Sequence, residues 1–217
     1  MLIQRTATVL IIVFSLALSV GVQAADFWQD DWSMAQGTES PRLKIEALES
    51  ADAGAIYRTY MDSQPWLYEQ LGWSWPSSKT SEEQNTSMVQ HMLKQMKRKA
   101  GFSFVVTDKQ TQQVVGMLFF APVSSERANG AALDASRFHA EVTWWLGQDA
   151  IARSLHNDLF ALTTDWLRAS WPWAQVLFPV AESNQSALAV LENSAARKVA
   201  TNRDTREVFY SYTLARK

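Results

Sequence analysis

The chain has 217 residues, no cysteine, ten tryptophans and a formal net charge of −2. Without cysteine it can form no disulfide framework, no thiolate nucleophile and no lipid-modified cysteine. The slight acidity argues against nucleic acid as a main partner, which would require a basic face.

The first residues show the order of features that marks an export signal. Arg5 precedes an apolar stretch over residues 6–22, and the small residues Val22 and Ala24 occupy the two positions that a signal peptidase reads. We expect residues 1–24 to be a cleavable signal peptide of a periplasmic or secreted bacterial protein that has no membrane contact after cleavage. An uncleaved anchor is the alternative, because the apolar stretch is close to the lower limit of about 17 residues for a spanning helix.

Beyond the signal, the pattern predicts a linker or N-terminal arm at residues 25–40 and one domain at 41–217. Six segments have the apolar pattern of strands: 42–47, 102–107, 114–123, 139–146, 173–181 and 207–214. Four have the apolar period of helices: 53–61, one from Thr80 or Ser81, one carrying Leu155, Leu159, Leu162 and Trp166, and 185–197. The order β-α-α-β-β-β-α-β-α-β predicts an α/β fold, an α+β mixed sheet with helices on both faces.

Two groups of residues have both a structural and a functional interpretation. Trp66, Trp73 and Trp75 lie in a stretch with prolines and a glycine that predicts a loop, and they are either core or a ligand-binding surface. Four basic residues gather at the end of the second predicted helix: Lys94, Lys97, Arg98 and Lys99. We expect this helix end to be a solvated face.

Four passages, in the order of the predicted elements, resemble the GNAT superfamily of acetyltransferases, and most of all its branch of ribosomal-protein N-terminal acetyltransferases. They are FSFVVTDKQTQQVVGMLFF with Gly116 in the family's glycine place, AEVTWWLGQDA, NQSALAVLENSAARKV with Asn184, and REVFYSYTL. The resemblance spans about Arg42 to Leu214 and implies a GNAT-like acyl-CoA N-acyltransferase fold. It also implies transfer of an acyl group from acetyl-CoA, as co-substrate, to an amine on a small molecule or peptide.

The same resemblance implies roles for particular residues. Glu141 stands on the fourth predicted strand, where several members place a general base, and His139 lies on the same strand face by alternation. Donor contacts are expected at the end of that strand, in the following turn and at the last helix, at Trp145, Leu146, Ala152, Arg153, Ser154, Leu155 and Asn184. Backbone amides of the turn would bind the donor's pyrophosphate at a helix N-terminus. No metal site is expected, since the three histidines lack ligand spacing.

This turn departs from the family pattern R/Q-x-x-G-x-G/A. Ile151, Ser154 and His156 stand where the family has a basic or amide residue and two glycines. Because a side chain there hinders close approach of a phosphate to the backbone, the alternative is a catalytically inactive binding or scaffold protein of the cell envelope, with an envelope protein as partner. An open cleft that reaches the Ala152–Leu155 amides would favour the enzyme, whereas a cleft filled by His156 or Trp145 would favour the binding protein.

Overall fold

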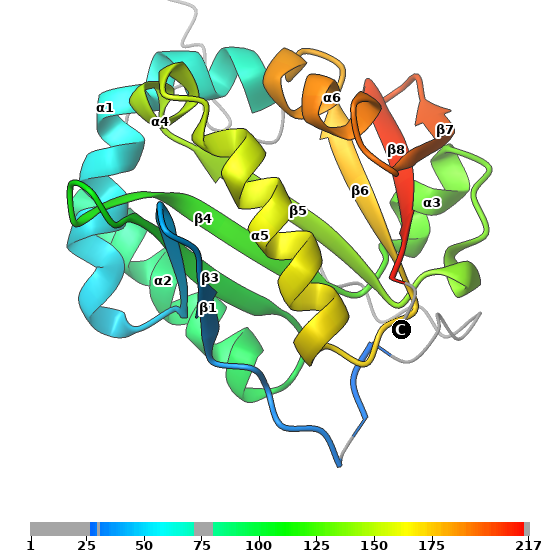
Figure 1. Ribbon diagram of the computed structural model, residues 1–217, viewed down its shortest axis with the longest axis horizontal. Coiled ribbons are helices and arrows are strands. Elements are labelled where there is room, and N and C mark those ends of the chain that lie inside the picture. The colour runs from blue at the N-terminus through cyan, green and yellow to red at the C-terminus, as the bar shows by residue number, and fades with distance from the viewer. Residues whose placement is uncertain (1–26, 30, 72–79, 215–217) are drawn as a thin grey trace, which may run out of the picture.

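The computed structural model describes residues 27–29, 31–71 and 80–214. One eight-stranded sheet runs through the molecule, and helices pack on both of its faces (Figure 1). The predicted α/β fold with a single mixed sheet is therefore confirmed. The predicted signal peptide, Trp73 and Trp75 lie outside the described residues. None of the described helices combines the length and the apolar character that crossing a membrane requires.

The strands lie in the order β1-β2-β3-β4-β5-β6-β8-β7. Their bounds are β1 Gly37–Glu39, β2 Leu43–Ala47, β3 Phe102–Asp108, β4 Gln113–Ala121, β5 Ala140–Leu146, β6 Gln175–Ala181, β7 Arg197–Asn202 and β8 Glu207–Thr213. Six of them correspond to the predicted segments. The exceptions, β1 and β7, are the two edge strands, and their largely exposed residues lack the apolar alternation on which the prediction depends.

β5 and β6 are the only parallel neighbours among the described strands, and they pair only at their beginnings. Ala140 pairs with Val176 and Glu141 with Leu177, and these two pairs are all of their described register. Pro179, two residues further along β6, has no amide hydrogen with which to extend a ladder. The two strands therefore diverge toward their carboxyl ends and leave a wedge in the middle of the sheet (Figure 1).

Two pairs of helices cover the two faces of the sheet. α1 (Ala53–Leu71) and α2 (Glu82–Lys97) cover one face, and α5 (Leu155–Ser170) and α6 (Gln185–Glu192) cover the other. The short helices α3 (Ser125–Gly130) and α4 (Gln148–Ala152) follow β4 and β5. Ser81 caps α2, because its hydroxyl accepts a hydrogen bond from the Gln84 amide while the Gln84 side chain accepts one from the Ser81 amide, as the predicted start requires.

Some predicted helix boundaries are wrong. α1 continues past Met61 to Leu71 and contains Pro65, so the expected loop at Trp66 is helical. Leu67 is buried beyond the proline, and this packing outweighs the hydrogen bond that the proline removes.

The chain that follows α6 and β4 also differs from the prediction. α6 ends at Glu192, and Arg197, expected to be its last residue, instead begins the edge strand β7. The stretch 124–136, in which no helix or strand was predicted, contains α3, which Ser124 caps by accepting a hydrogen bond from the Arg127 amide. The helix has six residues, too few for an apolar period to be visible in the sequence.

Half of the eight described tryptophans are buried in the core. Trp166, Trp171 and Trp173 are at most 4% exposed and form one aromatic cluster with Phe104 and Phe120 under α5. The centroids of the Trp171 and Trp173 rings are 4.6 Å apart. The high tryptophan content of this half of the chain is therefore explained by packing.

Residues 27–40 are packed on the domain where they are described. The Phe27 ring stacks on those of Phe102 and Trp173, and the Trp173 indole N–H donates a 2.9 Å hydrogen bond to the Phe27 carbonyl. Further along, β1 pairs antiparallel with β2 and extends the sheet. The expected N-terminal arm is thus joined to the core at both ends.

Candidate functional site

A small pocket lies at the open end of the wedge. It is lined by the last turns of α1, the end of β5, the α4 residue Ile151 and the start of α6, with Trp66, Leu71, Trp145 and Asn184 among the lining side chains. Its free volume is about 10 Å³, roughly the room of one water molecule. The described lining is mostly apolar, with Gln70, Asn184 and Ser186 as its polar side chains, and a thioester would enter only if the end of α1 moved away.

Asn184 has two roles in this arrangement. Its side-chain oxygen caps α6 by accepting hydrogen bonds from the Ala187 amide (3.1 Å) and from the Ser186 hydroxyl (3.0 Å), and the residue also lines the pocket. Asn184 can therefore cap α6 and contact a ligand in the same geometry.

The two neighbouring tryptophans of β5 face opposite ways. Trp144 lies near the rings of Phe160 and Phe178 on the α5 face, whereas Trp145 is buried in the cluster formed with α1 and α2. Strand alternation produces this arrangement. The wedge thus has an indole on each side of the sheet at its carboxyl end.

The turn between β5 and α5 keeps a conformation that usually requires glycine. Ser154 precedes α5 with φ 60° and ψ 24°, in the left-handed region. Serine here stands in the family's glycine place, and its backbone adopts a conformation that glycine enters at no steric cost. The first amides of the 16-residue helix α5 follow directly, and they form the kind of N-terminus that attracts an anion.

The beginning of the same turn is held by α1. The Gln148 amide donates a 3.0 Å hydrogen bond to the Ser63 hydroxyl, which is buried. A Cβ at Gly147 would lie 3.0 Å from that hydroxyl and 3.3 Å from the Thr59 methyl carbon, so the close approach of α1 favours glycine at this position. A serine on α1 therefore positions the entry to the turn, and no sequence motif marks it.

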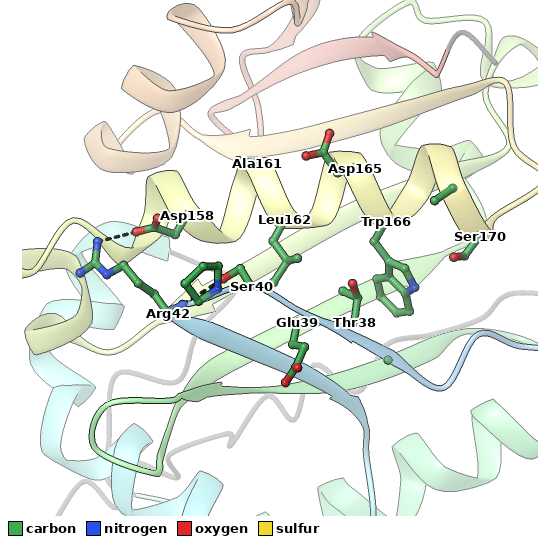
Figure 2. Close-up of a pocket in the computed structure, with 13 residues that line it drawn as sticks. Thr38, Glu39, Ser40, Arg42, Asp158, Ala161, Leu162, Asp165, Trp166 and Ser170 are labelled. Atoms are coloured by element: carbon green, nitrogen blue, oxygen red, sulfur yellow. Dashed lines mark hydrogen bonds and ion pairs between the residues drawn. The ribbon is translucent and has the colours of Figure 1, made fainter. Parts of the chain in front are cut away.

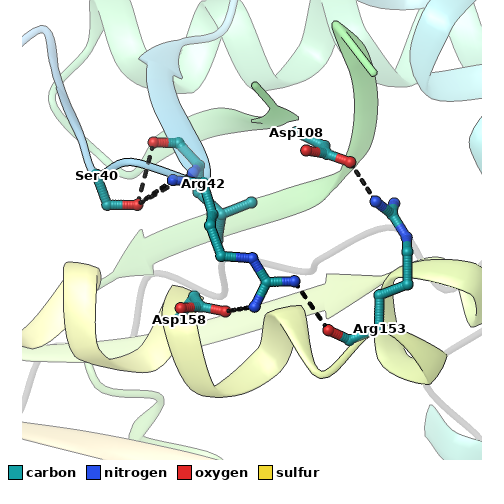
Figure 3. A network of polar contacts seen from close by, with 6 residues as sticks. Ser40, Arg42, Asp108, Arg153 and Asp158 are labelled. Carbon is teal, nitrogen blue, oxygen red and sulfur yellow. Dashed lines mark hydrogen bonds and ion pairs between the residues drawn. The ribbon is translucent and has the colours of Figure 1, made fainter. Parts of the chain in front are cut away.

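Two arginines hold the end of the turn (Figure 3). The Arg153 guanidinium forms an ion pair with the buried carboxylate of Asp108 at the end of β3. The Arg42 guanidinium donates to the Arg153 carbonyl (3.0 Å) and to Asp158 of α5 (2.7 Å). Arg153 was expected to contact the donor, but its guanidinium group lies toward the β3–β4 hairpin. The backbone of Arg153, rather than its side chain, takes part in the turn.

His156 is the second residue of α5. It is half-buried, and its Nδ1 atom is buried without a hydrogen-bond partner among the described residues. Burial lowers the pKa of its imidazole, against an opposing effect of Asp158. His156 is not among the described residues that line the wedge pocket, so it does not fill it.

Glu141 lies at the closed end of the wedge, in a buried charge network. One carboxylate oxygen accepts from the Ser124 amide (3.1 Å), and the other forms a 2.8 Å ion pair with Arg127, which also lies 3.4 Å from Glu207. Burial raises the pKa of Glu141, and the Arg127 charge opposes this effect. His139 is half-buried, with its Nδ1 3.3 Å from the Gln175 carbonyl oxygen.

The structure therefore brings the predicted residues together in two groups. Trp145, Leu146 and Asn184 meet in the wedge pocket, and residues 152–155 form the adjoining turn. Glu141 and His139 lie at the other end of β5 and are absent from the described lining. Sequence reasoning missed the α1 contribution, because α1 was expected to end at Met61. Among the described residues no group of three or more acidic or histidine side chains is placed to hold a metal ion.

A larger groove of about 650 Å³ runs between the β1–β2 connection and α5 (Figure 2). Glu39, Arg42, Asp158 and Asp165 contribute charged groups to it, and each of these has a partner of opposite charge. It lies outside the wedge, and none of the residues expected to contact the donor lines it.

Comparison with known proteins agrees with this architecture. Ribosomal-protein-S5-alanine acetyltransferase from Vibrio fischeri is similar over 82% of this chain and 96% of its own, with a TM-score of 0.62 and 15% identity. The ribosomal L7/L12 α-N-protein acetyltransferase in complex with coenzyme A is similar over 80% and 95%, with a TM-score of 0.58 and 20% identity. RimJ of Mycobacterium smegmatis, in complex with a CoA-disulfide, is similar over 79% and 81%, with a TM-score of 0.61 and 15% identity.

No curated protein matches the chain. The acetyltransferase (GNAT) domain, as a family, matches residues 42–197, which confirms the superfamily expected from the four sequence passages. The chain therefore belongs to the acetyltransferase (GNAT) domain family.

Proposed function

We propose that this protein is an N-acyltransferase of the bacterial envelope that transfers an acetyl group from acetyl-CoA to an amine. The observation that carries the proposal is the wedge between β5 and β6, which opens beside a helix N-terminus whose entry residue, Ser154, has a left-handed conformation that favours glycine. A donor can thus place its phosphates at α5 and its thioester between the two strands.

The residues around the turn fit an acyl-CoA donor in part. The amides that open α5 supply the anion site, and the unpartnered Nδ1 of His156 offers a further polar atom close to it. The wedge pocket is narrow, and the α1 residues Trp66 and Leu71 are the side chains that would have to move to admit the thioester.

In the reaction, the amine nitrogen attacks the thioester carbonyl carbon, an N–C bond forms and the C–S bond breaks. The nitrogen loses a proton to a base, and the departing thiolate takes up a proton. Glu141 is the candidate base, acting through water: each of its oxygens makes one described hydrogen bond and retains a second lone pair. A carboxyl group whose pKa is raised by burial is a stronger base than an exposed one.

The relatives suggest which class of acceptor amine should be screened first. One solved relative is named as an α-N-protein acetyltransferase of ribosomal L7/L12, and another as an acetyltransferase of an alanine in ribosomal protein S5. Peptides with a free α-amine are therefore the first acceptors to try, followed by small amines.

A second function is favoured by two specific observations. The wedge pocket holds about 10 Å³, and its described lining includes Trp145 but none of residues 152–155. In addition, both oxygens of Glu141 already have partners. An open cleft that reaches the turn amides would favour the enzyme, and the wedge pocket is neither open nor lined by that turn. These features therefore favour a non-catalytic GNAT-like protein that binds an envelope partner.

Calorimetric titration of acetyl-CoA into the chain from Ala25 onward separates the two functions. Micromolar binding, followed by amine-dependent release of free CoA thiol, supports the enzyme. No heat at millimolar acetyl-CoA contradicts the enzyme and supports the binding protein. Desulfo-CoA is the matched ligand, since it retains the phosphates and lacks the thiol, and its binding tests the turn separately from the wedge.

A further inference from the structure

The last turn of α2 and the residues after it carry four exposed cations. These are Lys94, Lys97, Arg98 and Lys99, here called the basic end. Among the described residues, no ion pair joins Lys94, Lys97 or Arg98 to a carboxylate. The helix dipole accounts for cations in the last turn, but not for one beyond it.

Lys99 occupies a position that usually takes glycine. α2 ends in a Schellman motif, in which the Ala100 amide donates to the Gln95 carbonyl and the Lys99 amide to the Met96 carbonyl, both at 3.0 Å. Lys99 therefore has a left-handed backbone, with φ 56°. A glycine would form this cap without strain, so the lysine side chain is retained at some expense to helix stability.

The N-terminal arm meets the basic end. The Lys99 ammonium nitrogen lies 5.3 Å from the centroid of the Trp28 ring, and that ring packs against Phe102 (4.9 Å) and Trp32 (5.8 Å). Trp28 and Trp32 are half-buried. Figure 1 shows the arm and the end of α2 on the same side of the molecule. Indole rings beside lysine and arginine are the side chains that membrane–water interfaces favour.

We propose that the basic end and the two indoles of the arm dock on an anionic lipid headgroup surface. Only two residues separate Ala24, the last residue of the expected signal peptide, from Phe27, which is fixed to the core through Trp173. A segment of that length spans at most roughly 10 Å, because an extended chain advances at most about 3.5 Å per residue. When the apolar segment enters a bilayer, this end of the domain faces the lipid.

Charge determines the orientation. The whole chain carries a net charge of −2, and the arm itself has an exposed acid at Asp31, so attraction to anionic lipid depends on the basic end facing it. Each cation held near such a surface strengthens binding by roughly fivefold at low salt. This surface departs from the expectation that the protein has no membrane contact after cleavage.

Vesicle sedimentation tests the proposal. Every described element and core residue lies beyond residue 26, so the chain from Ala25 is the protein to use. It should sediment with phosphatidylglycerol–phosphatidylcholine vesicles at low salt, and not with phosphatidylcholine vesicles. The triple variant Lys94→Gln, Lys97→Gln, Arg98→Gln should bind about 100-fold more weakly, since three fivefold contributions are lost.

A matched control lies at the other edge of the sheet. Arg197→Gln, Lys198→Gln and Arg203→Gln remove three exposed cations from β7 and the turn after it, and should change vesicle binding less than twofold. Equal losses in both triple variants, or no binding to anionic vesicles, would overturn the proposal. Binding to soluble polyglutamate without binding to vesicles would also overturn it, in favour of an acidic protein partner.

Lys99→Gly distinguishes a binding role from a merely structural one. The variant removes the left-handed strain and also the cation with its contact to the Trp28 ring, so its thermal midpoint should change little. Its affinity for anionic vesicles should nevertheless fall by roughly fivefold. Unchanged vesicle affinity would show that Lys99 acts only within the cap and would contradict its place in the docking surface.

Discussion

The ion pair between Arg153 and Asp108 fixes the turn before α5 to the β3–β4 hairpin (Figure 3). Asp108 is 2% exposed, and its carboxylate also accepts hydrogen bonds from the Gln110 amide (2.9 Å) and the Thr111 hydroxyl (3.1 Å). Burial alone would raise the pKa of Asp108, but the hydrogen bonds and the Arg153 charge outweigh it and leave the pKa below its ordinary value. The candidate anion site thus depends on a carboxylate at the end of another strand.

Arg153→Met should destabilise the protein, because it leaves the Asp108 carboxylate buried without a counter-charge. The guanidinium is partly exposed, so we expect a loss of about 1–3 kcal/mol at pH 7. A carboxyl group whose pKa is lower in the folded than in the unfolded protein stabilises the fold at pH values above its unfolded pKa. This stabilisation is lost as the pH falls through the folded pKa. The difference between variant and wild type should therefore shrink below about pH 4, which urea unfolding across pH measures. A difference independent of pH would show that Asp108 is not the cause.

Ser154→Gly tests the strained entry to α5. Glycine adopts the left-handed conformation without cost but loses more entropy on folding, so we expect a net gain of about 0.5 kcal/mol. If acetyl-CoA binds at this turn, removing the Cβ should also raise its affinity at least threefold. Gln112→Gly is the matched control, because Gln112 has φ 59° in the β3–β4 hairpin. This replacement should change stability by a similar amount to Ser154→Gly and leave the donor affinity unchanged. Equal affinity changes in both variants would place the donor elsewhere.

Arg127→Met should be among the most destabilising single changes. Arg127 lies between Glu141 and Glu207, both buried, and its loss leaves two carboxylates without a cation, which costs about 3–5 kcal/mol near neutral pH. Burial raises the pKa of Glu141, so the stability linked to this group is present below its ordinary pKa and is lost as the pH rises. The variant's penalty should accordingly be larger at pH 7.5 than at pH 5. Lys44→Met, which removes only an exposed pair with Glu46, should leave stability nearly unchanged.

Much of the fold follows from short-range pattern. The central strands are predictable because each alternates or is continuously apolar, and α2 because Ser81 and Gln84 form a capping box before its first turn. β1 and β7 escape prediction because edge strands bury little. α1 escapes it beyond Met61 because Pro65 suggests an end that tertiary packing of Leu67 overrides.

The candidate site is less predictable than the fold. The residues of the turn are contiguous, so a family pattern locates them in the sequence. Ser63, Arg42 and Asp108, which hold that turn, come from three other elements and show no pattern of their own. Arg127 lies on α3, so its ion pair with Glu141 depends on a helix that is too short to be expected from sequence.

Glu141→Gln measures whether this carboxylate is the general base. Glutamine can still accept the hydrogen bond from the Ser124 amide but is a far weaker base, so kcat/KM for acetyl transfer should fall by about 10²–10⁴. The acid limb of the wild-type pH profile should vanish in the variant, because that limb reports the ionisation of the base. Glu207→Gln is the control, since Glu207 shares Arg127 and is also buried but lies on β8, which β6 separates from the wedge. Its rate should remain within a few-fold of wild type. Equal losses in the two variants would mean that the charge network supports the fold and that the base lies elsewhere, whereas a selective loss with an altered pH profile would assign the proton transfer to Glu141.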